Sequence, residues 1–141
     1  MRWCFLCARF GLMAALFFAT SAGSGAEPSN ASGQTVKLVI DYNDGIQKVF
    51  AKIPWKSGMT VQDAMAAAQA SGHGIKYESK GSGETAFLIR IDDVQSLGAR
   101  GDKKNWVYSV NEKLADRGFG VYKLSAGDAV VWKFEPPRSG R

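Results

Sequence analysis

The chain has 141 residues, a length that allows one domain with short extensions. Its net charge of +5 is mild, and its lysines are spread along the sequence. Nucleic-acid binding requires a concentrated basic patch, so we expect no nucleic-acid partner. There is one histidine, and the two cysteines stand close to the start, which excludes a His–His or Cys–His metal set. We therefore expect no metal site.

Residues 1–26 are predicted to be a signal peptide. Arg2 and Arg9 provide a basic start, the apolar run Phe10–Ala19 follows, and small residues lead to Ala26. An uncleaved membrane anchor is the alternative, but the apolar run has about ten residues rather than about twenty. The mature chain would then lack cysteine, carry about +3 charges without the two leader arginines, and have no stable membrane insertion. We expect a secreted or periplasmic protein.

Residues 27–34 are predicted to be a flexible lead-in, followed by a β-hairpin. Val36, Leu38 and Ile40 alternate with other residues in a first strand, and residues 43–45, Asn-Asp-Gly, form a turn. The second strand is predicted to place Val49, Ala51 and Ile53 on one face. A calcium loop beginning in the turn is disfavoured, because its glycine comes one residue early and Lys52 stands near the position of the bidentate glutamate.

The next segment, Thr60–Ser71, is the one predicted helix. Thr60 can cap it with Asp63 as the capping-box acid, and Gly72 ends it. Its apolar residues fall on one face, as expected for packing on a sheet: Val61, Ala64, Met65 and Ala68. His73 follows between two glycines and is interpreted as a surface loop residue.

Strands are predicted in the rest of the chain wherever apolar residues alternate. Two of them are Ile75–Glu78 and Thr85–Asp92, the latter with Phe87, Ile89 and Ile91 on one face, and Val94–Lys104 is predicted to be a long surface loop. Three more are Trp106–Val110, Phe119–Tyr122 and Ala129–Phe134, with turns at 111–118 and 126–128. A hairpin, one helix and several strands predict an α+β fold, a β-grasp-like mixed sheet packed on a single helix.

Several of these segments together resemble a known family. The chain is similar to the transcobalamin-like C-terminal domain family, bacterial domains of unknown function that resemble the β-domain of transcobalamin and intrinsic factor. The similarity spans residues 35–134, which leaves 135–141 as a tail. It depends on these segments: Thr60–Ala64, Ile75–Glu78, Ile89–Asp92, Asn105–Asn111, Phe119–Tyr122, Gly127–Asp128 and Val130–Trp132.

The resemblance implies a soluble ligand-binding module with a β-grasp fold. In the vitamin carriers this domain covers one side of cobalamin, and the equivalent contacts here would come from Tyr108, Leu114 and the segment 83–85, with Glu84 and Thr85. Two features depart from the carriers. The chain contains no counterpart of their large helical domain, so only half a pocket is expected, and the turn 112–118 is more charged than a corrin-facing turn needs.

The aromatic residues allow two interpretations. Trp106, Tyr108, Tyr122 and Trp132 could form a surface for a flat ligand, or they could fill the core of a small domain. Core packing is favoured for Trp106 and Trp132, and the alternatives are balanced for Tyr108 and Leu114.

We expect no catalytic residues, because the sequence shows no cysteine nucleophile after the leader, no histidine triad and only scattered carboxylates. The predicted function is a non-enzymatic module that binds a small molecule, with cobalamin or a related corrinoid as the candidate and no other cofactor. The alternative is a cell-envelope module that binds a protein partner or a surface through an exposed sheet edge.

Overall fold

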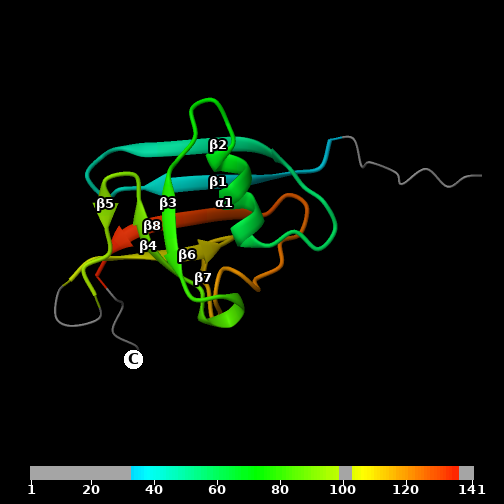
Figure 1. The fold of residues 1–141 in the computed structure, drawn as a ribbon. Helices are drawn as coiled ribbons and strands as arrows, with labels where there is room; N and C mark the ends of the chain where they lie inside the picture. The colour runs from blue at the N-terminus through cyan, green and yellow to red at the C-terminus, as the bar shows by residue number, and fades with distance from the viewer. Residues whose placement is uncertain (1–32, 99–102, 137–141) are drawn as a thin grey trace, which may run out of the picture.

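The computed structural model describes residues 33–98 and 103–136, and it shows the predicted α+β fold with a single α-helix (Figure 1). The predicted signal peptide, residues 27–32 of the lead-in and residues 137–141 of the tail lie outside the described residues. Within the described part, no helix has the length and apolar character needed to cross a membrane. The elements are β1 (Thr35–Asp41), β2 (Gln47–Pro54), α1 (Val61–Gln69), β3 (Tyr77–Lys80), the 3₁₀ turn η1 (Gly83–Thr85), β4 (Phe87–Ile91), β5 (Val94–Gln95), β6 (Asn105–Val110), β7 (Lys113–Leu114) and β8 (Ala129–Glu135).

Two sheets share one core. The larger has the strand order β2-β1-β8-β6-β7, in which β1 and β8 run parallel and the other neighbours run antiparallel. This is the predicted mixed sheet. Strands β3, β4 and β5 form a second, antiparallel sheet rather than extending the first. Figure 1 shows α1 and the small sheet on the same side of the large one.

Helix α1 begins as predicted. The Thr60 hydroxyl accepts from the backbone N–H of Asp63, and the Asp63 carboxylate accepts from the backbone N–H of Thr60, which completes a capping box. The predicted apolar stripe is buried against the sheet: Val61, Ala64, Met65 and Ala68. His73 is exposed, in agreement with its interpretation as a surface loop residue.

The hairpin of β1 and β2 is also confirmed, but its second strand differs in detail. The prediction that Val49, Ala51 and Ile53 share a face is wrong, because the register shifts between Val36 and Leu38. Leu38 pairs with Phe50 and Val36 pairs with Ile53, so three β2 steps oppose two on β1, as in a β-bulge. Phe50 and Ile53 consequently face the core, while Val49 pairs with Val39 on the opposite face.

A chain of aromatic rings fills the core beneath α1. Trp106, Tyr108 and Val110 are buried on one face of β6, and Val130 and Trp132 are buried on the same face of β8. The Trp132 ring lies 4.8 Å from the Tyr108 ring and 5.5 Å from the Phe119 ring, centroid to centroid. These contacts correspond to the core interpretation of the aromatic strands.

The predicted strand Phe119–Tyr122 is wrong, since these residues form a turn. The backbone N–H groups of Val121 and Tyr122 donate to the carbonyl of Gly118. The carbonyls of Tyr122 and Phe119 accept from the N–H groups of Val61 and Gln62. Those two donors have no partner inside α1, because the first turn of a helix leaves its N–H groups free. The segment therefore completes the start of the helix instead of pairing with a strand.

Four further predictions, of two strands, a loop and a turn, are corrected by the observed strand pairing. Ile89 is bulged between the pairs Glu78–Arg90 and Ser79–Leu88, so Leu88 and Ile91 are buried while Phe87 is exposed, and the three predicted residues do not share a face. The strand predicted at 75–78 lies at 77–80, the loop predicted at 94–104 contains β5, and the turn predicted at 111–118 contains β7.

A polar cluster centred on Asp92 joins the two sheets. Its carboxylate accepts from the Tyr42 hydroxyl, from the Lys48 ammonium at 2.9 Å and from the backbone N–H of Lys76 at 2.9 Å. Burial by itself would raise the pKa of Asp92, but these three donors together hold it below its ordinary value. Burial, and then the bond to Asp92, raises the pKa of Tyr42.

This cluster predicts a specific loss of stability in acid. Because the pKa of Asp92 is lower in the folded chain than in the unfolded chain, its contribution is present above the unfolded value near 4 and disappears as the pH falls through the folded value. Asp92→Asn should cost about 1–2 kcal/mol at pH 7 and less at pH 3. Urea unfolding across this pH range measures both effects. Asp93→Asn, at the exposed neighbour, is the control. An equal cost of Asp92→Asn at both pH values would contradict the assignment.

Candidate functional site

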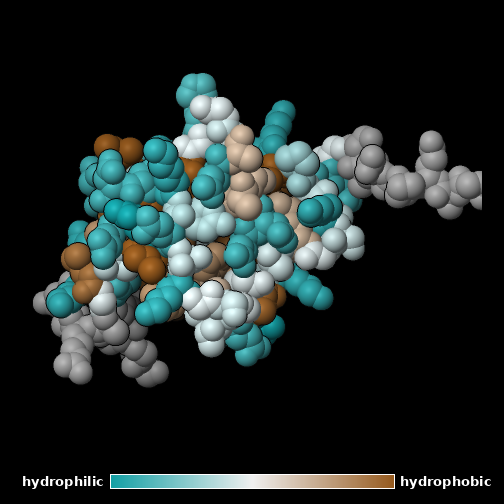
Figure 2. All heavy atoms as spheres, in the orientation of Figure 1, coloured by the Kyte–Doolittle hydropathy of each residue, from teal (hydrophilic) through white to brown (hydrophobic). Residues whose placement is uncertain are grey.

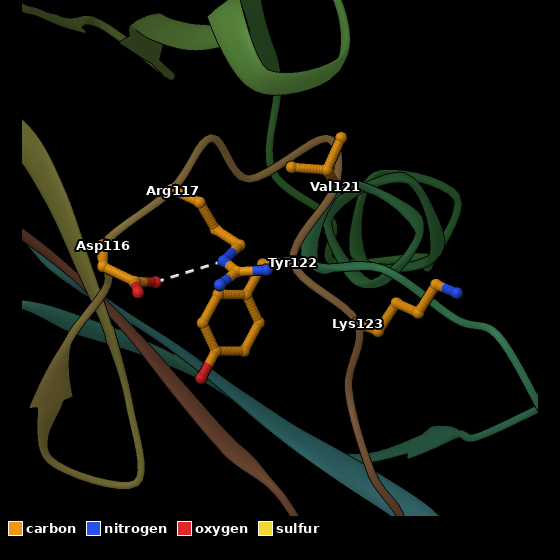
Figure 3. Close-up of a pocket in the computed structure, with 5 residues that line it drawn as sticks. All are labelled: Asp116, Arg117, Val121, Tyr122 and Lys123. Atoms are coloured by element: carbon orange, nitrogen blue, oxygen red, sulfur yellow. Dashed lines mark hydrogen bonds and ion pairs between the residues drawn. The ribbon is translucent and has the colours of Figure 1, made fainter.

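One end of the large sheet carries an open hollow built by the loop between β7 and β8. Its volume is about 500 Å³, and five consecutive or nearly consecutive loop residues line it: Asp116, Arg117, Val121, Tyr122 and Lys123. Figure 3 shows Asp116 and Arg117 on one side of the loop, with the Tyr122 ring beside the Arg117 side chain and Lys123 pointing the other way. We refer to this feature as the Arg117 hollow.

Two glycines allow η1 to pack directly against the wall of this hollow. A Cβ atom at Gly118 would lie 2.4 Å from the carbonyl oxygen of Glu84, and one at Gly120 would lie 2.9 Å from that of Gly83. Both distances are too short for any side chain. Segments about 35 residues apart in the sequence, 83–85 and 117–122, are thus brought into backbone contact at the edge of the hollow.

Charge and ring contacts define the chemistry of the hollow. The Arg117 Nε atom lies 3.2 Å from the Asp116 carboxylate, and this bond lowers the pKa of Asp116 and raises that of Arg117. Both side chains are more than half exposed, so the ion pair is accessible to a competing anion. The half-buried Tyr122 ring packs edge to face on Tyr108, with centroids 6.0 Å apart. The hollow can therefore offer a guanidinium and an aromatic ring to a ligand, while the Lys123 ammonium at its rim points away from them.

Four of the six residues predicted to bind a ligand lie in or around this hollow. Tyr122 lines it directly. Glu84 and Thr85 belong to η1, which packs on the neighbouring backbone. Tyr108 is buried, and its hydroxyl donates to the carbonyl of Arg117 at 2.6 Å. Burial, followed by the nearby Tyr122 and Asp116, raises the pKa of Tyr108. Tyr108 thus supports the loop from within the core.

The other two predicted residues lie elsewhere. Leu114, 52% exposed, lies on the face of the sheet opposite α1, beside a shallow hollow of about 220 Å³ that Tyr108 also borders from within its strand. Trp106 is buried, donates through Nε1 to the carbonyl of Val94 at 2.9 Å, and borders an apolar hollow of about 330 Å³ with Phe87 and Ile89. The structure therefore does not gather all six residues into one site.

Sequence reasoning missed the polar members of the Arg117 hollow. The charge of the turn 112–118 counted against a flat apolar ligand, although Asp116 and Arg117 are two of the five lining residues. The signal that could have identified them is the Gly118-x-Gly120 spacing, since closely spaced glycines next to charged residues mark a close approach of another backbone segment.

Among residues 33–98 and 103–136, no three His, Cys, Asp or Glu side chains lie close enough together to hold a metal ion.

Comparisons with known proteins give one family and several solved structures. A crystal structure from Ruminococcus gnavus ATCC 29149, named "a putative metal binding protein", superposes with a TM-score of 0.55 and 13% identity over 73% of this chain and 97% of that chain. At this identity the similarity concerns the fold alone. No curated protein matches the chain. A family model matches residues 58–136, more than half of the chain and the part that includes α1, the small sheet, strands β6 to β8 of the large sheet and the Arg117 hollow. The chain therefore belongs to the family described as Domain of unknown function (DUF4430).

Proposed function

We propose that this chain is an exported, non-enzymatic module that binds a small anionic ligand with a flat ring system at the Arg117 hollow. One observation carries the proposal: η1 and the loop 116–123 converge, through Gly118 and Gly120, on an open hollow with a guanidinium beside a tyrosine ring. Its volume of about 500 Å³ falls within the ordinary range of small-molecule sites.

A corrinoid such as cobalamin is the first ligand to test. The resemblance to the transcobalamin β-domain assigns ligand contacts to the segment 83–85 and to the turn after β6, and η1 and part of that turn border the same hollow. Cobalamin combines a flat ring with a phosphate group, and Arg117 suits the phosphate because a guanidinium binds such oxygens in a bidentate manner. The hollow is open on one side, so we propose that a separate protein closes it over the ligand.

Metal binding, the property in the name of the Ruminococcus gnavus protein, has weaker support for this chain. The described residues contain no carboxylate, histidine or cysteine cluster of three. The hollow offers one carboxylate, Asp116, and that group is paired with Arg117 at 3.2 Å. A cation would have to displace the guanidinium to reach it.

Equilibrium dialysis of the purified protein against cyanocobalamin, measured by corrin absorbance, tests the proposal. Arg117→Ala should raise the Kd about tenfold, because a charge-assisted hydrogen bond to the ligand is lost. Lys52→Ala removes an equal charge from exposed β2 and should leave the Kd unchanged. Absence of binding at a few hundred micromolar, or equal losses in both variants, would contradict the corrinoid assignment.

A second candidate function, a cell-envelope interaction module, is favoured by a different observation. The face of the large sheet opposite α1 carries valine and leucine side chains that the described residues leave without a covering layer. An apolar sheet face of this kind is typical of protein interfaces.

A further inference from the structure

An apolar row crosses all five strands of the large sheet on the face opposite α1. The strand register aligns Val49 with Val39, Val39 with Val131, Val131 with Ser109, and Ser109 with Leu114. Four of the five positions are therefore aliphatic. A sheet with one solvated face ordinarily places polar residues on that face, so this row calls for a physical explanation. We refer to it as the valine row.

No helix or strand of the described part of the chain lies over the valine row. Leu38 and Ile40 of β1 belong to the cluster of buried core residues, and Val39 between them does not. Val39 is nevertheless only 8% exposed. Val39 is thus shielded by its neighbours on the outer face rather than by the core. Val49 and Leu114, at the two ends of the row, are each 52% exposed. Helix α1 and the small sheet both lie on the other side (Figure 1).

The helix side of the molecule differs from this face. Figure 2 views that side and shows hydrophobic residues in small, separate groups among polar ones. Such scattered residues are normal on a protein surface and need no partner. A continuous apolar row across a whole sheet is a different feature.

On β1, the charged residues on the two sides of the valine row have opposite signs. Asp41 stands one outward-facing position beyond Val39 along β1, and Lys37 stands one such position before it. Asp41 shares its face with Lys133, 3.8 Å from it, and with Gln47, whose amide donates to its carboxylate at 3.1 Å. The Lys37 side chain is exposed. Asp41 and Lys37 therefore lie at equal distances from the row, on its two sides.

We propose that this face docks a second copy of the same chain, sheet against sheet, about a two-fold axis that runs along the valine row. Rotation by 180° about that axis places each strand of one copy over the same strand of the other copy, and the two strands run in opposite directions. Each residue of the row then meets its own counterpart, Asp41 of one copy meets Lys37 of the other, and Lys133 meets Ala129. No like charges on β1 or β8 face each other. A two-fold interface requires this kind of self-complementary surface.

The dimensions of the face set the expected strength. Five strands about 4.8 Å apart span roughly 20 Å, and the longer strands, with about three outward-facing positions each, give a height of roughly 15–20 Å, while β7 contributes only Leu114. Such a footprint is smaller than that of a standard specific interface and is typical of weak, transient ones, so we expect a dimer with a Kd on the order of 10–100 µM. The proposal does not depend on the Arg117 hollow, which lies at one end of the sheet.

Sedimentation velocity of the purified protein over a range of concentrations is the test. Wild type should pass from monomer to dimer over tens of micromolar. Val49→Lys with Leu114→Lys places four like charges in the dimer at positions exposed in the monomer, and it should raise the Kd by more than about tenfold. The matched control is Ile46→Lys with Phe87→Lys, which adds the same charge at equally exposed hydrophobic residues outside the row and should leave the Kd unchanged.

A second variant tests the axis itself. Lys37→Glu places an acid opposite Asp41 of the other copy and should weaken the dimer about tenfold. Far-ultraviolet circular dichroism verifies that each variant is folded. A wild-type protein that stays monomeric to several hundred micromolar would overturn the proposal. So would a dimer that is insensitive to the row variants, because another face would then form it, or one insensitive to Lys37→Glu, because the axis would differ.

Discussion

Replacing Trp132 by alanine is expected to lower the free energy of unfolding by about 4 kcal/mol, the largest effect of any substitution in this core. Trp132 is 2% exposed and contacts the rings of Tyr108 and Phe119. Its removal leaves a cavity that neither ring can fill, because Tyr108 is held by its bond to the Arg117 carbonyl. The loss is large enough to leave much of a marginally stable domain unfolded.

Urea unfolding followed by circular dichroism measures this loss, and Trp132→Phe is the matched variant. The Trp132 Nε1 atom is buried without a hydrogen-bond partner among the described residues. Phenylalanine therefore gives up ring volume but no hydrogen bond, and should cost about 1–2 kcal/mol. Equal costs for the two variants would mean that the indole N–H has a partner, such as a buried water, whose loss dominates.

Gly118→Ala is expected to destabilise the fold by about 3 kcal/mol through a clash of backbone atoms. The new Cβ would lie 2.4 Å from the Glu84 carbonyl oxygen and 2.8 Å from its carbon, so η1 and the loop must move apart. The same movement should open the wall of the Arg117 hollow. We therefore expect this variant to lose cyanocobalamin binding even under conditions in which it is folded.

Gly72→Ala is the control, because a Cβ at Gly72 meets no atom within 4 Å and its φ is ordinary for an L-residue. It should change the free energy of unfolding by no more than about 0.5–1 kcal/mol, in either direction. Thermal and urea unfolding of both variants provide the comparison. A Gly118→Ala protein as stable as Gly72→Ala would show that η1 does not pack against the loop as described.

The local elements follow from short-range rules, and the sequence predicts them well. The capping box of Thr60 and Asp63 needs residues only three apart, and the hairpin needs only the turn at 43–45. Alternation in β6 and β8 predicts which aromatic residues share a face, and those residues are buried together. In each case the feature depends on residues a few positions apart, so the local sequence pattern is enough to predict it.

Predictions fail at two kinds of position: where a distant segment supplies the hydrogen-bond partner, and where a β-bulge shifts the register of a hairpin. Residues 119–122 have the composition of a strand, but their carbonyls satisfy the N–H groups at the start of α1, some 60 residues earlier. The bulges in β2 and β4 shift the register by one residue, which moves side chains to the opposite face. Neither the hydrogen bonds of residues 119–122 nor the two bulges can be recognised from the local alternation of apolar residues.

The candidate sites likewise combine features that the local sequence determines with features that only tertiary contacts determine. From its own residues the chain determines one helix, a mixed sheet and an aromatic core, because propensity, capping and alternation act within a few positions. Tertiary structure alone decides that the loop carrying Arg117 and Tyr122 borders η1, and that Val39 and Val131 lie side by side in one row. The first contact joins segments about 35 residues apart and the second joins strands about 90 residues apart. Strand order and register, which set those contacts, are fixed only when the whole core is packed.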